Sequence, residues 1–222
     1  MAKRAAVAEH LHQEEFAEGE NGGRQVYTGS SANARPYQVD VVLKGTTTLL
    51  LHGYNVDAVE AKGKEAKGSR SKKTDDVESF VTRDQAGHIC VPMTYLHACI
   101  RDTGKFKQDP RSPRKSMFDL LKAAVGVLPE LLVLRNADGK LCKDWDMIDK
   151  RRACVMRAAV NRCRPAFLPG WTVEATLDVL LPEYLSEQTL HELLTDAGRV
   201  TGLADYRPLF GRFALESFKR RK

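Results

Sequence analysis

The pattern of apolar and polar positions is most regular in the last third of the chain. From Trp171 to Leu180 apolar residues alternate with polar ones, so that Val173, Ala175 and Leu177 share one side. Period-two alternation is typical of a strand with one buried face. This segment is therefore predicted to be a half-buried strand that ends before Pro182.

A helix is predicted directly after this strand. Ser186 can cap the free N–H groups, and Leu185 and Leu190 stand at the two positions of a hydrophobic staple. The expected buried stripe consists of Leu190, Leu193, Leu194 and Ala197. Gly198 is expected to stop the helix. A Gly- and Arg-bearing loop then leads into a last strand over residues 213–218.

The same kinds of pattern occur earlier in the chain. Residues 37–54 alternate and then run apolar, which predicts a long strand, bent at Gly45. Residues 88–91 predict a short strand, and a helix is expected from Thr94 to Gly104. Its apolar positions are Leu96, Cys99, Ile100 and Thr103. Residues 117–124 are also helical in pattern, whereas 150–164 fit either a strand or a helix, so the class is α+β.

Composition adds a basic character. The 222 residues carry a formal net charge of +6 with a pI of about 9.1, which favours a polyanionic partner. One basic run, residues 61–73, includes Lys67, Lys72 and Lys73 and has almost no large apolar side chain. It is either a solvated loop or a basic finger that becomes ordered along phosphates. A second basic loop spans 105–115.

Cysteine content and hydropathy bear on the compartment. The five cysteines form no C-x-x-C pair and are an odd number, so reduced thiols are expected rather than a disulfide framework or a zinc site. No segment has the run of apolar residues that spans a bilayer, and residues 1–20 lack the apolar centre of a secretory signal. A cytoplasmic protein without membrane contacts is expected.

Two motifs resemble those of the RAMP superfamily, which builds the backbone of CRISPR effector complexes. The pattern G-x-x-x-x-R-x-x-x-G-R-F is matched by Gly202, Arg207, Gly211, Arg212 and Phe213. Residues 90–101 are similar to the family's I-P-G-S-S-L-K-G-x-x-R. There Pro92, Thr94, Leu96 and Arg101 carry over, whereas Met93 and His97 replace the family's glycine and lysine. The first strand, with Gly45 and residues 49–52, fits as well.

The resemblance implies a fold and a function. The fold would be a ferredoxin-like (RRM-like) β-α-β-β-α-β antiparallel sheet over residues 36–222, after a flexible arm at 1–35 and with a thumb-like insertion at about 55–87. The chain would bind single-stranded RNA or DNA along its sugar–phosphate backbone, self-associate along the strand or join other effector subunits, and need no cofactor. Its gene would belong to a CRISPR locus, a phage or another mobile element.

The residues expected to contact nucleic acid are basic. They are Arg101, Lys105, Arg111, Arg114, Arg207 and Arg212, together with Lys67, Lys72 and Lys73. The arginines are the strongest candidates, because the planar guanidinium group matches a phosphate. For Arg207 the alternative is a structural role, in which it ties its loop to Asp205 or to a carbonyl group. Tyr206 and Phe210 are candidate stacking platforms, whereas Phe213 is expected in the core.

Three alternatives remain open at this point. Some RAMP subunits cut RNA with an aspartate of the insertion, and Asp76 is the weak candidate for that role here. A basic scaffold subunit that contacts only protein is the second alternative. Metal sites at His88-x-Cys90 with His97-x-Cys99, or at Asp144, Asp146 and Asp149, are less favoured than buried thiols and an anchoring Trp145.

Overall fold

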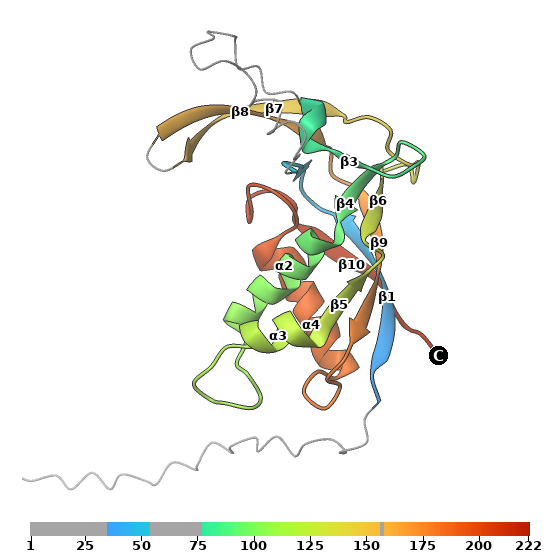
Figure 1. Cartoon of the computed structure of the whole chain (residues 1–222), viewed down its shortest axis with the longest axis vertical. Helices are drawn as coiled ribbons and strands as arrows, with labels where there is room; N and C mark the ends of the chain where they lie inside the picture. The colour runs from blue at the N-terminus through green and yellow to red at the C-terminus, as the bar shows by residue number, and fades with distance from the viewer. Residues whose placement is uncertain (1–34, 54–76, 156–157) are drawn as a thin grey trace, which may run out of the picture.

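The computed structural model describes residues 35–53, 77–155 and 158–222 of the chain. In this part the protein is a mixed α+β structure around a seven-stranded antiparallel sheet (Figure 1). The strands of this sheet are β1 (Tyr37–Gly45), β3 (Thr82–Arg83), β4 (Ile89–Pro92), β5 (Val125–Leu128), β6 (Leu131–Arg135), β9 (Thr172–Val179) and β10 (Phe213–Arg220).

The centre of the sheet is formed by the two longest alternating segments. β1 pairs with β10 along one edge and with β9 along the other, with Val41 opposite Ala175. The far edge of β9 pairs with β5 at one end and with β6 at the other. The order is β10-β1-β9-β6-β4-β3, with β5 beside β9. β10 is therefore an edge strand among the described residues.

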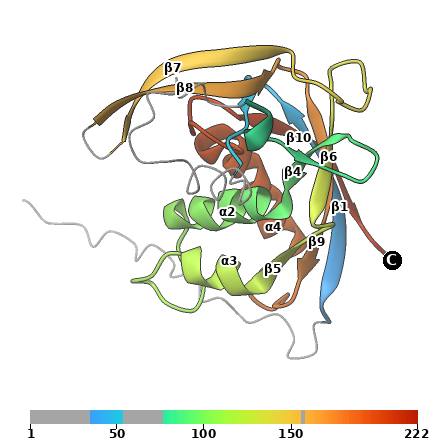
Figure 2. The ribbon, with the colours of Figure 1, turned by 45° about the horizontal axis from the view of Figure 1, so that its top comes forward.

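Helices cover one face of this sheet. They are α2 (Met93–Thr103), α3 (Phe118–Ala124) and α4 (Glu187–Asp196), and the short turns are η1 (Val77–Phe80), η2 (Gly104–Phe106) and η3 (Ala197–Thr201). Both views place the three helices on the same side of β1 and β9 (Figures 1 and 2). The core lies between the two layers, because the alternating positions of β1 and β9 and the helix stripes are buried together.

The strand–helix units follow their sequence patterns closely. Leu96, Cys99, Ile100 and Thr103 are the buried positions of α2, as expected. In α4, the Oγ of Ser186 accepts a hydrogen bond from the N–H of Thr189 at 3.2 Å. One expectation is wrong, because the helix does not stop at Gly198 but continues as the π-helical turn η3 and ends at Gly202, whose φ is +75°.

The described part of the stretch predicted as one strand over 37–54, residues 37–53, does not form one strand. β1 ends at Gly45, where the ring of Trp171 leaves no room for a side chain, and the indole N–H of Trp171 donates to the carbonyl of Thr47 at 2.8 Å. The chain then enters a separate sheet as β2 (Leu49–Leu50). Trp171 is fully buried, so this corner is part of the core.

A second, three-stranded sheet has the order β2-β8-β7. Its long strands, β7 (Met147–Val155) and β8 (Ala158–Phe167), form a hairpin, which decides between the two conformations open for 150–164. The hairpin passes over the end of the large sheet, above the helices in Figure 1. Trp145 precedes it in a loop and packs against the core, as expected of an anchoring residue. In the described ranges no helix is long and apolar enough to cross a membrane.

Candidate nucleic-acid interface

The Gly- and Arg-bearing loop at residues 202–212 is the most constrained backbone segment of the described chain. Gly202 and Gly211 have φ values of +75° and +72°, and Ala204 and Tyr206 also have positive φ, at +64° and +59°. A Cβ on Gly211 would lie 1.8 Å from the carbonyl oxygen of Leu203. Residues other than glycine adopt such φ values at a cost and cluster at functional sites, so this loop is a candidate for function.

Backbone hydrogen bonds hold the loop in this shape. The N–H of Leu203 donates to the carbonyl of Gly211 at 2.7 Å, which closes the base of the loop. The N–H of Asp205 donates to the carbonyl of Leu50 at 3.0 Å. The loop is thereby fixed to β2, and its arginines project from a defined backbone rather than from a free tail.

Three cations converge on one carboxylate beside this loop; we call Arg101, Asp102, Lys105 and Arg207 the Asp102 cluster. One carboxylate oxygen of Asp102 lies 3.1 Å from both Arg101 Nη2 and Lys105 Nζ, and the other lies 3.5 Å from Arg207 Nη2. Arg101 and Lys105 come from the end of α2 and from η2, whereas Arg207 comes from the loop. Three positive charges around one negative charge leave a formal surplus of two.

The electrostatics of the cluster follow from this arrangement. Partial burial raises the pKa of Asp102, but hydrogen bonds from Lys105 and Arg101 outweigh it, and the pKa lies below its ordinary value. Both cations also lie 5.1 Å from the ring centroid of Phe118. The aromatic ring and the carboxylate together hold the two side chains in place.

The hairpin contributes arginines on the other side of the loop. Arg164 of β8 pairs with Asp205, and its guanidinium lies 5.4 Å from the ring centroid of Tyr206. Arg151 of β7 lies 4.4 Å from the ring centroid of Phe210. The candidate stacking rings are thus already in contact with guanidinium groups, which link the loop to the hairpin.

Two hollows adjoin the loop at the Asp102 cluster. One, of about 540 Å³, is lined by Asp102, Lys105 and Tyr206 among others, and the second, of about 300 Å³, by His52 and Tyr95. Arg207 borders both hollows. A nucleic-acid strand that lies along the cluster would therefore meet hollows as well as positive charge.

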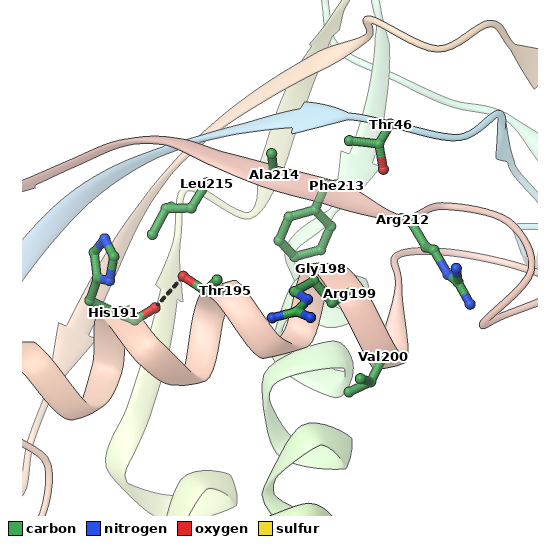
Figure 3. A pocket seen from close by; sticks show the side chains of 10 residues that line it. All are labelled: Thr46, His191, Thr195, Gly198, Arg199, Val200, Arg212, Phe213, Ala214 and Leu215. Carbon is green, nitrogen blue, oxygen red and sulfur yellow. Dashed lines mark hydrogen bonds between the residues drawn. The ribbon is translucent and has the colours of Figure 1, made fainter.

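A third hollow lies between α4–η3 and the edge strand β10; we call it the β10 groove. Its volume is about 740 Å³, and its walls include Thr46, His191, Arg199, Val200, Arg212 and Leu215. Figure 3 shows His191 at one end and Arg212 at the other, with Arg199 and Val200 between them on the helix side. The guanidinium Nε of Arg212 donates to the carbonyl of Pro208 at 2.9 Å, so the groove begins where the loop ends.

The sheet face opposite the helices is a poor nucleic-acid platform. Its positions on β1 and β9 alternate with the buried ones and include Asp40, Glu174 and Asp178. None of these outward positions on the two strands is aromatic. Stacking on exposed rings is how four-stranded sheets usually bind single strands, so the interface is better placed at the loop.

The structure brings together some of the basic residues expected at the site and separates others. Arg101, Lys105 and Arg207 form the Asp102 cluster, and Arg212 lines the β10 groove. Arg111 instead pairs with Asp109 at 2.7 Å and lies 5.6 Å from the ring centroid of Tyr184. Arg114 is exposed in the same loop. Lys67, Lys72, Lys73 and Asp76 lie outside the described residues.

Sequence reasoning missed two members of this surface. Asp102 was not singled out, although its position next to Arg101 and three residues before Lys105 on a helix is a recognisable pairing signal. Arg199 had no such signal, because Gly198 was expected to end the helix before it. Its position in the groove depends on the continuation of α4 into η3.

The metal alternatives find no support in the described chain. No group of three or more His, Cys, Asp or Glu side chains there is arranged to hold a metal ion. Cys90 and Cys99 are buried thiols, as expected. Burial raises the pKa of Cys99 to about 12, so it stays protonated at neutral pH.

Comparison with known proteins gives a relationship at the level of fold alone. No protein-family model matches the chain, and no curated protein matches its sequence. Among solved structures it is similar to a chain from the cryo-EM structure of the type III-B Cmr-beta complex bound to cognate target RNA, with a TM-score of 0.51 and 11% identity. The match covers 85% of this chain and 61% of that one. The chain thus shares its fold with about three fifths of that chain.

Proposed function

We propose that this protein binds single-stranded RNA along its sugar–phosphate backbone. The observation that carries the proposal is the Asp102 cluster, in which three cations from two separate segments surround one carboxylate beside a constrained loop. A surplus of positive charge at fixed positions is what a polyanion requires. The fold shared with a chain of an RNA-bound complex supports RNA as the polyanion.

The fold can be assigned more finely within this proposal. Taken in chain order, β1, α2, β5, β9, α4 and β10 follow the β-α-β-β-α-β sequence, and these strands lie side by side as β10-β1-β9-β5. This order supports a ferredoxin-like core of the RAMP type. Residues 36–222 would then be one domain, with segments between β1 and α2 and between β6 and β9 as additions.

The carboxylate of Asp102 has a defined part in the proposed binding. In the free protein it holds Arg101, Lys105 and Arg207 in one place, and the contact to Arg207 is the longest, at 3.5 Å. A phosphate oxygen that approaches the cluster competes for these guanidinium and ammonium groups. Binding is charge-assisted but partly offset by the broken ion pairs, so moderate affinity with a steep dependence on salt is expected.

Single strands are favoured over duplexes by the shape of the surface. The hollows beside Arg207 and the rings of Tyr206 and Phe210 can accommodate unpaired bases, which a duplex keeps inside its stack. Partners that fit this proposal are a single strand of RNA and, along a longer strand, further copies of the chain or other effector subunits.

The test is fluorescence anisotropy with protein freed of nucleic acid at high salt. Single-stranded RNA, single-stranded DNA and duplex are titrated across a salt series with the wild type and with an Arg101→Ala/Arg207→Ala variant. The matched control is Arg35→Ala/Lys122→Ala, which removes the same charge from exposed positions outside the cluster. The variant is expected to lose about tenfold or more in affinity for single strands, and the control to change little.

Two results would contradict the proposal. Equal and weak binding to all three polyanions, unchanged in the cluster variant, would mean that only general basicity attracts nucleic acid. An absence of binding together with stable complexes with other proteins would identify a scaffold subunit instead.

A further inference from the structure

The β10 groove differs from the Asp102 cluster in what neutralises its charge. Neither Arg199 nor Arg212 has a carboxylate partner among the residues that the structure describes, and no acidic side chain lines the groove. Within those residues the Arg212 guanidinium donates to the carbonyl of Pro208 and to no carboxylate. Anionic groups that enter the groove would therefore meet these guanidinium groups without displacing a carboxylate.

The groove is also lined by apolar surface. Val200 is 45% exposed on η3, and Leu215 on β10 faces it, with the buried Phe213 behind (Figure 3). Polar groups stand at the two ends, where His191 and Thr46 can offer hydrogen bonds. An apolar hollow of several hundred Å³ with a few polar groups has the make-up of a small-ligand pocket.

The groove adjoins the proposed RNA surface at Arg212 and at Val200, which also lines the hollow beside the Asp102 cluster. Arg212 lies at the groove and its Nε holds the carbonyl of Pro208 in the loop that bears Arg207. The base of that loop is rigid, since Leu203 and Gly211 are hydrogen-bonded at 2.7 Å. A nucleic-acid strand that extends from the Asp102 cluster across this loop would reach the groove next.

We propose that the β10 groove is a nucleotide subsite, in which Arg199 and Arg212 bind the two phosphates that flank one nucleotide and its base lies against Val200 and Leu215. The inference rests on the proposed RNA binding and deepens it. It assigns to the groove one unpaired nucleotide of the bound strand. The two flanking phosphates match the two unneutralised guanidinium groups, and the flat base matches the apolar wall.

Two variants separate the phosphate contact from the base contact. Arg199→Ala removes one guanidinium, and Val200→Trp fills the apolar part while it leaves both arginines in place. The probes are a 12-nucleotide oligouridine and a ribose–phosphate strand of the same length without bases. Arg35→Ala is the control, because it removes an arginine near the start of β1, whereas the groove lies at the other end of that strand.

The expected results differ between the two probes. Arg199→Ala weakens both strands by a similar factor of about ten and lowers the salt slope by about 0.7. Val200→Trp weakens the oligouridine several-fold but leaves the strand without bases unchanged. A 4-thiouridine strand is expected to crosslink to the peptide that contains Leu215, which lines the groove and not the hollow beside the Asp102 cluster, whereas Val200 lines both.

Failure of the subsite is distinguishable from failure of RNA binding. If the wild type binds single strands and the Asp102 cluster variant weakens it, but Arg199→Ala and Val200→Trp bind like Arg35→Ala, the groove is not a subsite while RNA binding stands. If the groove variants lose only the assembly with a protein partner, the occupant is a protein and the inference is wrong. Thermal unfolding of each variant confirms that the change is not a loss of fold.

Discussion

The Asp102 cluster and the β10 groove both adjoin the loop 202–212, and both are cationic. In the cluster, Arg101, Lys105 and Arg207 share one partly buried carboxylate. In the groove, Arg199 and Arg212 share none among the described residues. The cluster is thus held in shape before any ligand binds, whereas the groove keeps its charge available. Substitutions in the cluster are therefore expected to change both stability and affinity, whereas substitutions in the groove are expected to change mainly affinity.

The largest expected effect comes from the loop that both regions share. Gly211→Ala is expected to lower the free energy of unfolding by about 2–4 kcal/mol, because the added Cβ would meet the carbonyl of Leu203 at a positive φ. Urea unfolding measures this. Gly139→Ala is the control, since its φ is +77° but nothing lies within 4 Å of an added Cβ, and about 1 kcal/mol is expected. Equal losses of stability in the two variants would contradict the role given to the close contact between Gly211 and the carbonyl of Leu203.

The two regions can then be compared directly by their salt dependence. An Arg199→Ala/Arg212→Ala variant is expected to lower the slope of log Kd against log salt by about 1.4, or about 0.7 for each phosphate that is no longer neutralised. The Arg101→Ala/Arg207→Ala variant is expected to lower it less, because Asp102 already neutralises part of the charge of these cations in the free protein. Anisotropy titrations across a salt series provide both slopes. A smaller change in slope for the groove variant than for the cluster variant would contradict this comparison.

Removal of the shared carboxylate acts on stability and affinity in opposite directions. Asp102→Asn is expected to lower the free energy of unfolding by about 1 kcal/mol, because three cations lose their anchor. RNA affinity is expected to rise several-fold at low salt, since the same cations become available. Denaturation and anisotropy are measured on the same preparation. A fall in affinity without loss of stability would show that Asp102 positions the cations for binding.

The smallest expected effect is a dependence on pH. The folded protein holds the pKa of Asp102 below its ordinary value near 3.8. Its contribution to stability is therefore fully present above that value and is lost as the pH falls through the lowered folded pKa. The difference in stability between wild type and Asp102→Asn should be constant from pH 7 to pH 5 and shrink below about pH 4. A difference that already shrinks above pH 5 would contradict this assignment.

Much of the fold was predictable from short-range pattern. The stripe at Leu96, Cys99 and Ile100 and the alternation from Val173 to Val179 specify which faces are buried, because periodicity depends only on local geometry. The same logic failed at Gly198 and at residues 46–53. There the outcome depends on contacts with Phe213 and Trp171, which are remote in the sequence.

The candidate site was only partly predictable for the same reason. The motif with Gly202, Arg207 and Gly211 was visible, and so was the basic character of Lys105. The sequence could not show that Asp102 would draw Arg207 from 105 residues away, or that Arg199 would face a groove. Each of these depends on how α2, η3 and the loop pack against one another.

By itself, the sequence of this protein determined most of the strands and helices, their buried faces and an excess of positive charge. Those properties arise from neighbouring residues and from composition. Only the tertiary structure decided which arginines are neutralised and which remain available, because ion pairs join segments that the chain keeps far apart. That distribution of charge is set by packing, and it divides one basic surface into the Asp102 cluster and the β10 groove.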